Sequence, residues 1–270
     1  MTAIDRLIAF GDSWTFGSEL RDPAIPDCTS DYDGRNDAHR LRHAWPAVLG
    51  QLLGAAAVQN LGTAARSNDT ICRDLRSWLA REGYLSGRDT RGLLICIGWT
   101  SPERRDFFFR SPDELQNPDQ GWMTMYPMWS HAYAHPALDQ FSRLYVQHFW
   151  HPEEYLQRWI TQLVDTQHLL RNLGIRNCQF QAFYQHHHQL IADWDDESWT
   201  AAHGLQPDLR EMWRSLDGHS FMHRDDVRQT FHNHIRELGT DMFSGNHPSE
   251  LGHAAWAEHM ARWIGNRSDA

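Results

Sequence analysis

The chain has 270 residues, of which 41% are hydrophobic and 22% charged, enough apolar side chain for a packed core, so wholesale disorder is excluded. Its net charge of −10 at pH 7 opposes the counterion release through which proteins bind phosphate backbones, so we expect no nucleic-acid partner. All 25 basic residues are arginine, which excludes a Schiff-base lysine and a P-loop lysine.

The N-terminus and the cysteines are informative about the cellular location of the protein. No run of about 18 apolar residues occurs, and the N-terminus lacks the basic start and long apolar stretch of a signal peptide, so we expect no membrane segment and a cytoplasmic location. The four cysteines are scattered without a CxxC pair and predict free thiols, mostly in the core. Oligomeric state cannot be read from one sequence.

Apolar runs and helical periodicity alternate along the chain. Strands are predicted at residues 7–10, 55–58, 93–97 and 178–184, with a weaker fifth near 220–223. Helices are predicted at 45–53, 69–79, 152–173 and 248–264, the last capped by Asn246 or Ser249. This alternation predicts a parallel sheet covered by helices.

Two segments depart from the alternation. Residues 18–43 are polar and acidic, and residues 101–151 are rich in aromatic side chains. Both follow predicted strand ends, where ligands bind in open parallel sheets, so both are candidate walls of a cleft. For the aromatic stretch, the core of a helical insertion is the favoured interpretation. We therefore expect one α/β domain over 1–270, with insertions at about 18–43 and 101–151.

Four short motifs lie at the ends of these predicted elements. They are Gly11-Asp12-Ser13, Asn60-Leu61-Gly62 with Ser67-Asn68, Gly98-Trp99-Thr100, and His247-Pro248 with Gly252-His253. Together they resemble the sequence blocks of the GDSL/SGNH hydrolases, over residues 7–260. The resemblance implies a flavodoxin-like, three-layer αβα sandwich with a parallel sheet of about five strands. It also implies a metal-independent serine hydrolase, so no cofactor is expected.

Carried over by position, the resemblance makes Ser13 the nucleophile and its N–H the first oxyanion donor. The second donor is the N–H of Ala65, where the family has glycine. The third is Thr100, where the family has asparagine; a hydroxyl can donate, but its reach is shorter. We also assign substrate contacts to neighbours of these motifs and to one residue that follows the fourth strand: Asp12, Trp14, Asn68, Trp99 and His186.

The resemblance makes His247 the general base, which accepts the proton of Ser13. The family's aspartate, three residues before this histidine, is replaced by Ser244. The imidazole is then oriented by Asp241, or by Asn246, or the enzyme works as a Ser-His dyad, which is the preferred interpretation. His253 lies inside the predicted helix and is expected to pack or to form a hydrogen bond there.

Other histidines have spacings that metal ligands can have: 186–188, 232 with 234, 148 with 151, and 131 with 135. Solvated or cleft-lining histidines are the favoured interpretation. The consecutive residues 186–188 point in different directions, and the i, i+2 pair 232 with 234 does not share a helix face. Arg104 and Arg105 are expected to form salt bridges.

The sequence therefore predicts a carboxylic ester hydrolase, an esterase or deacylase acting on a small-molecule or glycan ester. Three alternatives remain open. They are a catalytically weak ligand-binding protein of the same fold, an acyltransferase, and a metal-dependent hydrolase that uses the histidine clusters.

Overall fold

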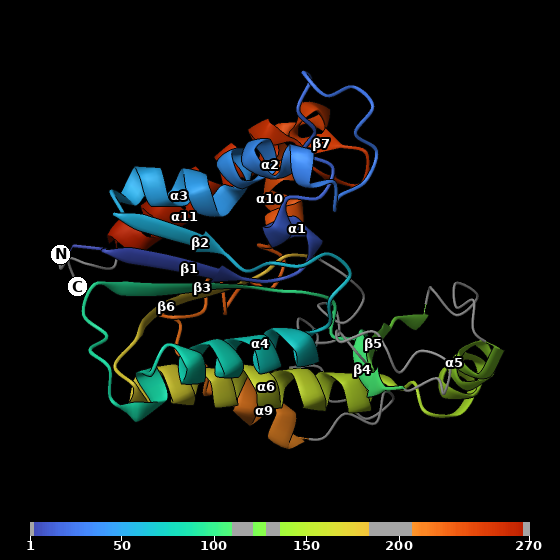
Figure 1. The fold of residues 1–270 in the computed structure, drawn as a ribbon. Coiled ribbons are helices and arrows are strands. Elements are labelled where there is room, and N and C mark those ends of the chain that lie inside the picture. Colours follow the sequence, from blue (N-terminus) through green and yellow to red (C-terminus); the bar gives the residue numbers. More distant parts are fainter. Residues whose placement is uncertain (1–2, 110–120, 128–135, 184–206, 267–270) are drawn as a thin grey trace.

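The computed structural model describes residues 3–109, 121–127, 136–183 and 207–266. Four parallel strands form the central sheet in the order β2-β1-β3-β6 (Figure 1). Their bounds are Arg6–Phe10 for β1, Ala57–Asn60 for β2, Leu93–Trp99 for β3 and Arg176–Gln181 for β6. Gln179 forms one parallel bridge to Phe221, which lies where a fifth strand was predicted.

The sheet is buried between two helical layers, as expected for parallel strands with long apolar runs. All seven residues of β3 are buried, and β3 lies between β1 and β6. One face is covered by helices α4 (Asn68–Arg81), α6 (Pro152–Asn172) and α9 (Pro207–Arg214). The other face is covered by α3 (Trp45–Leu53), α10 (Phe231–Leu238) and α11 (Glu250–Asn266).

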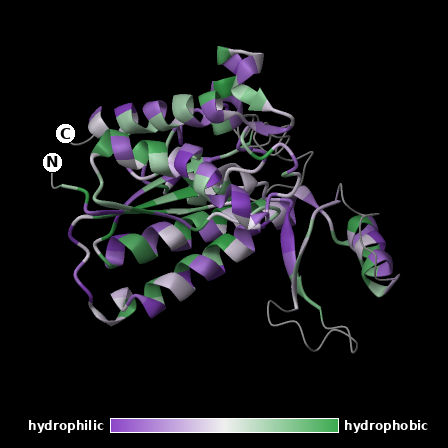
Figure 2. Ribbon diagram, turned by 45° about the horizontal axis from the view of Figure 1, so that its top comes forward, coloured by the Kyte–Doolittle hydropathy of each residue, from purple (hydrophilic) through white to green (hydrophobic). Residues whose placement is uncertain are grey.

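Each layer has its own hydrophobic core. Trp159 and Leu163 of α6 pack on one face of the sheet with Ile95, whereas Trp45 and Trp256 pack on the other, and all five are fully buried. In Figure 2 the central strands are largely hydrophobic and the helices alternate hydrophobic with hydrophilic residues. The α/β class and the three layers predicted from the sequence are therefore confirmed.

Shorter elements complete the described part of the chain. At the carboxyl end of the sheet, α1 (Ser13–Phe16) follows β1, and the hairpin β7 (Phe243–Ser244) with β8 (His247–Pro248) precedes α11. Helix α2 covers Asp37–His43, and single 3-10 turns cover Gly34–Asn36, Tyr84–Ser86 and Thr240–Met242. The segment after β3 forms the hairpin β4 (Arg105–Phe108) with β5 (Trp122–Met125), followed by α5 (Pro136–His148).

Most predicted bounds agree with the structure within two residues. Helix α3 agrees at both ends, and Ser249, one of the two predicted caps of α11, accepts the Gly252 N–H at 3.3 Å. The fourth predicted strand is the exception, because β6 ends three residues before its predicted end.

Several compositional expectations can also be compared with the structure. All four cysteines are free and buried, as predicted. In the described part of the aromatic segment, Phe107 packs edge-on against Phe141 and Tyr145, with ring centroids 4.8 and 5.3 Å apart. Among the described residues, no helix combines the length and apolar character needed to cross a bilayer.

Candidate active site

Ser13 is the first residue of α1, directly beyond the carboxyl end of β1. The α1 helix begins there because the Asp12 carboxylate accepts the Trp14 N–H at 3.0 Å. It ends after one turn because Gly17 adopts a left-handed conformation, φ +88°. Ser13 is 7% exposed, so its hydroxyl lies at a buried corner that is fixed by the sheet.

A cavity of about 330 Å³ opens at this corner. Its walls come from six separate parts of the chain: Ser13, Trp14, Ser18, Asp31, Ala64, Ala65, Arg104, Phe183, Asn246 and His247. The structure thus brings the predicted nucleophile, the predicted base and the predicted second oxyanion residue to one cavity. Both segments proposed as cleft walls contribute to it, 18–43 through Ser18 and Asp31 and 101–151 through Arg104.

Ala65 supports the glycine equivalence inferred from the sequence. Its φ is +62°, in the left-handed region that glycine adopts freely and other residues enter at a cost of roughly 1–2 kcal/mol. Among the described residues, neither its N–H nor that of Ser13 donates a backbone hydrogen bond. Two N–H groups at the cavity wall are therefore available to a ligand.

His247 lies in β8 and faces the segment that follows α1. Its Nδ1 is 3.3 Å from Glu19 Oε1, which is an ion-pair distance without the alignment of a hydrogen bond. The second carboxylate oxygen, Glu19 Oε2, accepts the Asn246 N–H at 3.0 Å. Glu19 therefore contacts both the imidazole and the turn that carries it.

Two backbone features let Glu19 reach this position. Glu19 itself has φ +66°, and its N–H donates to Asp31 Oδ1 at 3.1 Å. Gly245 has φ +63°, and a Cβ there would lie 2.5 Å from Glu19 Oε2. The glycine thus leaves the space that the carboxylate occupies.

Asp31 is held as a carboxylate by its neighbours. Burial raises its pKa, but the nearby Ser18 side chain and the hydrogen bonds from the Glu19 N–H and Arg21 outweigh this effect, so the pKa lies below its usual value. Arg21 Nη2 lies 2.6 Å from Asp31 Oδ1. An ionised Asp31 is a strong acceptor for the backbone N–H that positions Glu19.

A second buried network lies behind Ser13. Asp12 is fully buried, and its Oδ2 accepts the Thr100 hydroxyl at 2.5 Å and Arg104 Nη1 at 3.2 Å. Arg104 also donates to the Arg66 carbonyl at 3.1 Å. This network joins the first and third motifs beneath the cavity.

A family model described as a family of unknown function, DUF6071, matches residues 24–269. The chain belongs to the DUF6071 family. The match contains His247 and the Ala65 region, and it begins after Ser13 and Glu19. No curated protein matches the chain.

Three solved structures are similar to this DUF6071 protein at low identity. A lipolytic protein of the G-D-S-L family from Desulfitobacterium hafniense is 14% identical, with TM-score 0.44, over 96% of this chain and 99% of its own. Another from Veillonella parvula is 12% identical, with TM-score 0.42, over 95% and 96%. Phospholipase A1 from Streptomyces albidoflavus is 12% identical, with TM-score 0.35, over 98% and 100%.

Several site predictions for the DUF6071 chain need correction. The Thr100 hydroxyl is committed to Asp12, so it does not face the cavity as an oxyanion donor. Asn68 forms a reciprocal pair with the Thr100 backbone, at 2.9 and 3.1 Å, and Trp99 is fully buried with its Nε1 on Gln179. Asp12, Asn68 and Trp99 therefore shape the corner and do not line the cavity.

The role predicted for Asp241, one of the two candidate orienting groups of His247, is also corrected. The Asp241 carboxylate contacts the Thr240 hydroxyl at 3.3 Å, and its carbonyl accepts from Ser249 at 2.6 Å. Neither contact involves His247. The preferred dyad stays a prediction, and the structure adds a carboxylate that the sequence analysis did not consider, because Glu19 Oε1 lies 3.3 Å from Nδ1.

Other sequence predictions have mixed outcomes. Trp14 lines the cavity and packs edge-on against Phe183, with ring centroids 4.8 Å apart, whereas His186 lies outside the described residues. His253 is fully buried and its Nδ1 accepts the Trp45 N–H at 3.2 Å, as predicted. The salt bridges predicted for the two arginines are present: Arg104 with Asp12 and Arg105 with Glu154.

The histidines selected by spacing form no three-ligand group within the described ranges. His151 Nδ1 instead accepts the Glu153 N–H at the start of α6. His232 Nδ1 lies 3.2 Å from Asn233 Oδ1, and burial lowers the pKa of His232 and His234. The 131 with 135 pair and the 186–188 run lie outside the described residues.

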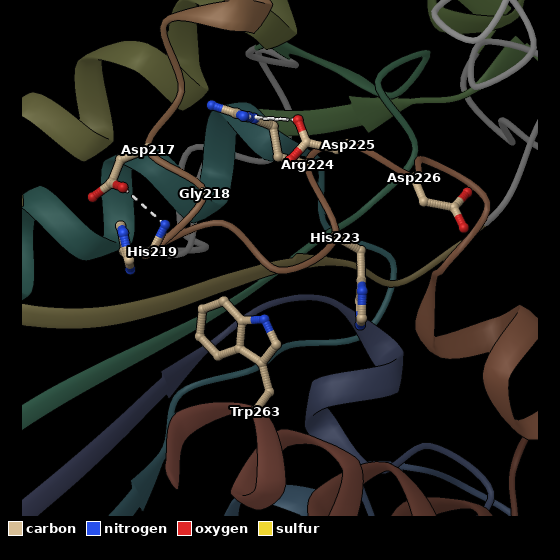
Figure 3. Close-up of a pocket in the computed structure, with 8 residues that line it drawn as sticks. All are labelled: Asp217, Gly218, His219, His223, Arg224, Asp225, Asp226 and Trp263. Carbon is tan, nitrogen blue, oxygen red and sulfur yellow. Dashed lines mark hydrogen bonds and ion pairs between the residues drawn. The ribbon is translucent and has the colours of Figure 1, made fainter. Parts of the chain in front are cut away.

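A larger cavity, of about 610 Å³, lies elsewhere (Figure 3). The loop 217–226 and Trp263 of α11 line it, and Figure 3 shows Arg224 paired with Asp225 at its rim. Neither Ser13 nor His247 contributes to it. The predicted nucleophile Ser13 and the predicted base His247 meet at the smaller of these two cavities, so we take the smaller cavity as the candidate site.

Proposed function

We propose that this DUF6071 protein is a serine hydrolase of ester-type bonds, with Ser13 as nucleophile and His247 as general base. The observation that carries the proposal is the single cavity lined by Ser13, Ala65 and His247, with the Glu19 carboxylate 3.3 Å from Nδ1 of the base. A hydroxyl, an imidazole and a carboxylate are the three groups that nucleophilic acyl transfer uses.

The position of Glu19 decides which ring nitrogen acts. Because Nδ1 faces the carboxylate, Nδ1 carries the proton and Nε2 accepts the proton of Ser13 Oγ. Oγ then bonds to the substrate carbonyl carbon. Nε2–H returns the proton to the departing alcohol, and the acyl group stays on Ser13. Water repeats the sequence, releasing the carboxylic acid and restoring the serine hydroxyl.

The negative oxygen formed in each step needs donors. The N–H groups of Ser13 and Ala65 are proposed for this role, since both residues line the cavity and neither N–H is used by the described backbone. Arg104 adds a guanidinium to the same wall, where its positive charge favours a developing anion. This set replaces the Thr100 hydroxyl inferred from the sequence.

A fluorophosphonate probe tests the proposal, because it labels only an activated serine. Ser13→Ala should abolish labelling and the hydrolysis of p-nitrophenyl acetate. Ser18→Ala is the matched control, since Ser18 lines the same cavity but lies outside the Gly11-Asp12-Ser13 motif. Labelling should persist in this control. Persistent labelling of Ser13→Ala, or an unlabelled native protein, would refute the proposal.

A second readout separates hydrolysis from acyl transfer. With p-nitrophenyl acetate in water alone, the hydrolase should release acetate and p-nitrophenol in equal amounts over many turnovers. A single burst of p-nitrophenol without turnover would instead mean that the acyl group waits for another acceptor.

A further inference from the structure

A cluster of two histidines and one glutamate lies away from the Ser13 cavity, between α2 and the first residue of α11. His39 and His43 are one turn apart on α2, and their ring centroids are 4.4 Å apart. Glu250 reaches both rings: its Oε1 is 3.0 Å from His39 Nε2, and its Oε2 is 2.9 Å from His43 Nδ1.

We infer that His39, His43 and Glu250 form a binding site for one Zn²⁺ ion. Two imidazole nitrogens and a carboxylate oxygen are a donor set that zinc binds, and the three ligand atoms all lie within 4.8 Å of one another. Tetrahedral bonds of about 2.0–2.1 Å place ligand atoms roughly 3.3 Å apart. The two carboxylate–imidazole spacings, 3.0 and 2.9 Å, would widen by a few tenths of an ångström, and the remaining spacing, which is within 4.8 Å, would adjust by a side-chain rotation.

The exposure of the three groups suits an ion with one open position. The His39 side chain is 12% exposed, and its Nε2 is buried without an aligned hydrogen bond among the described residues. The Glu250 side chain is 47% exposed, so water can reach the fourth coordination position. The buried nitrogen gains a strong partner when the metal binds, which a carboxylate at a poor angle does not provide.

The donor set also predicts which ions bind. Mg²⁺ and Ca²⁺ prefer oxygen ligands only, so they should not compete at a site with two nitrogens. Ni²⁺ and Cu²⁺ accept imidazole and should bind as well. Among the physiological candidates, zinc fits both the nitrogen donors and the tetrahedral spacing.

The position of the cluster gives the ion a structural role. Helix α2 belongs to the segment 18–43, which supplies Glu19, and Glu250 begins the helix that follows His247. A bound ion therefore links the segment that holds the carboxylate to the segment that holds the base. The inference does not depend on the proposed hydrolase activity, because the ligands are not in the Ser13 cavity.

Metal binding by the whole protein tests this inference. After dialysis against EDTA, calorimetric titration with ZnCl₂ should show one tight equivalent per chain, and MgCl₂ should show none. Zinc at about a hundred times its dissociation constant should raise the melting temperature by roughly 5 °C. Cobalt in place of zinc should give the visible absorption bands of a tetrahedral nitrogen–oxygen site.

Matched variants test whether these three residues hold the bound zinc ion. Glu250→Gln keeps the shape of the side chain but removes its charge, and His43→Ala removes one nitrogen. Both should lose the tight equivalent and the zinc-dependent rise in melting temperature. His223→Ala is the control, because His223 lies 2.8 Å from His259 in another histidine pair and should leave zinc binding unchanged.

The inference fails if the native protein takes up no tight zinc. It also fails if Glu250→Gln and His43→Ala, folded by circular dichroism, bind zinc as the native protein does. The test measures metal content and melting temperature. It therefore remains valid even if the ester hydrolase proposal is refuted.

Discussion

The β1–α1 corner and the segment 18–43 contribute to the same cavity, but different forces hold them. The corner is fixed by packing, since Phe10, Asp12 and Trp14 are at most 3% exposed. The segment is held by polar contacts, such as Asn36 Nδ2 to the Leu20 carbonyl at 2.7 Å and Arg40 Nη1 to the Phe16 carbonyl at 2.7 Å. Changes in the segment should therefore impair the site without unfolding the sheet, whereas changes in the core should lower stability first.

The largest expected effect is a loss of turnover when Glu19, in the segment 18–43, is substituted. Glu19→Gln keeps the size of the side chain but removes the negative charge that lies 3.3 Å from Nδ1 of His247. Turnover of p-nitrophenyl acetate should fall by about 10²- to 10⁴-fold with little change in KM, because the lost interaction is strongest in the transition state.

Asp241→Asn is the control for this change, because the Asp241 carboxylate contacts Thr240 and not the imidazole. It should leave turnover within about two-fold of the native value. A large loss in Asp241→Asn together with a mild effect of Glu19→Gln would reverse the assignment of the acid.

The next effect is on stability, in the core. Leu163→Ala removes a fully buried side chain of α6 and should lower the free energy of unfolding by about 2–5 kcal/mol, because a cavity remains in the core. Urea denaturation measures this loss. Turnover per folded molecule should stay unchanged, since Leu163 is on the far layer from His247.

Leu41→Ala, in the segment, serves as the comparison for the core variant. Leu41 is 42% exposed, so its removal should change the free energy of unfolding by less than about 0.5 kcal/mol. Equal destabilisation by the two substitutions would mean that the segment is part of the cooperative core.

A smaller loss of turnover is expected when a side chain at position 245 displaces the Glu19 carboxylate. Gly245→Ala adds a Cβ 2.5 Å from Glu19 Oε2, so it should displace the carboxylate and lower turnover by about ten-fold. Gly54→Ala is matched for backbone strain, because Gly54 has φ +67° and no atom within 4 Å of the added Cβ.

Both glycine variants should lose roughly 1 kcal/mol of stability from the left-handed φ, as chemical denaturation can show. Only Gly245→Ala should lose turnover. Equal activity in the two variants would argue that the Glu19 contact does not matter to catalysis.

The smallest effect concerns acid stability. Burial, with a further contribution from the charge of His247, lowers the pKa of His253 from 6.5 to about 3. Between these values the unfolded chain binds a proton that the folded chain does not, so stability should fall as pH falls below about 6.5, by up to ~1.4 kcal/mol per pH unit.

His253→Asn keeps an acceptor for the Trp45 N–H but does not titrate in this range. Denaturant melts at pH 7, 6, 5 and 4 should show a shallower fall in stability for this variant than for the native chain. An identical slope would show that other buried histidines, such as His259, whose pKa burial lowers to about 4, account for the effect.

Local sequence patterns were sufficient to predict most of the helices and strands. Helix α3 was predicted at both ends because a proline near its start and Gly54 after its end are local signals. Ser13, Ala65 and His247 were assigned through the resemblance of the short motifs to the GDSL/SGNH sequence blocks, and the structure brings all three to one cavity. The predicted fifth strand was weakly marked, and the structure has a single bridge at Phe221 there.

Contacts between distant segments were not predictable in the same way. Thr100 was assigned to the cavity by position, but its hydroxyl is used by Asp12, which no spacing rule indicates. Glu19 lies 227 positions before Asn246 and was missed, although the acidic segment and the unusual Ser244 were the available signals. The His39, His43 and Glu250 cluster was missed because two of its ligands share a helix and the third begins another.

The sequence by itself determined the alternation of strands and helices and the buried sheet, because hydrophobic periodicity and turn residues act over a few positions. Only the tertiary structure decided which carboxylate faces His247 and which side chains meet at the metal-binding cluster. Those choices depend on how loops from opposite ends of the chain pack together, and here they rest on the left-handed backbone of Glu19 and the space left by Gly245.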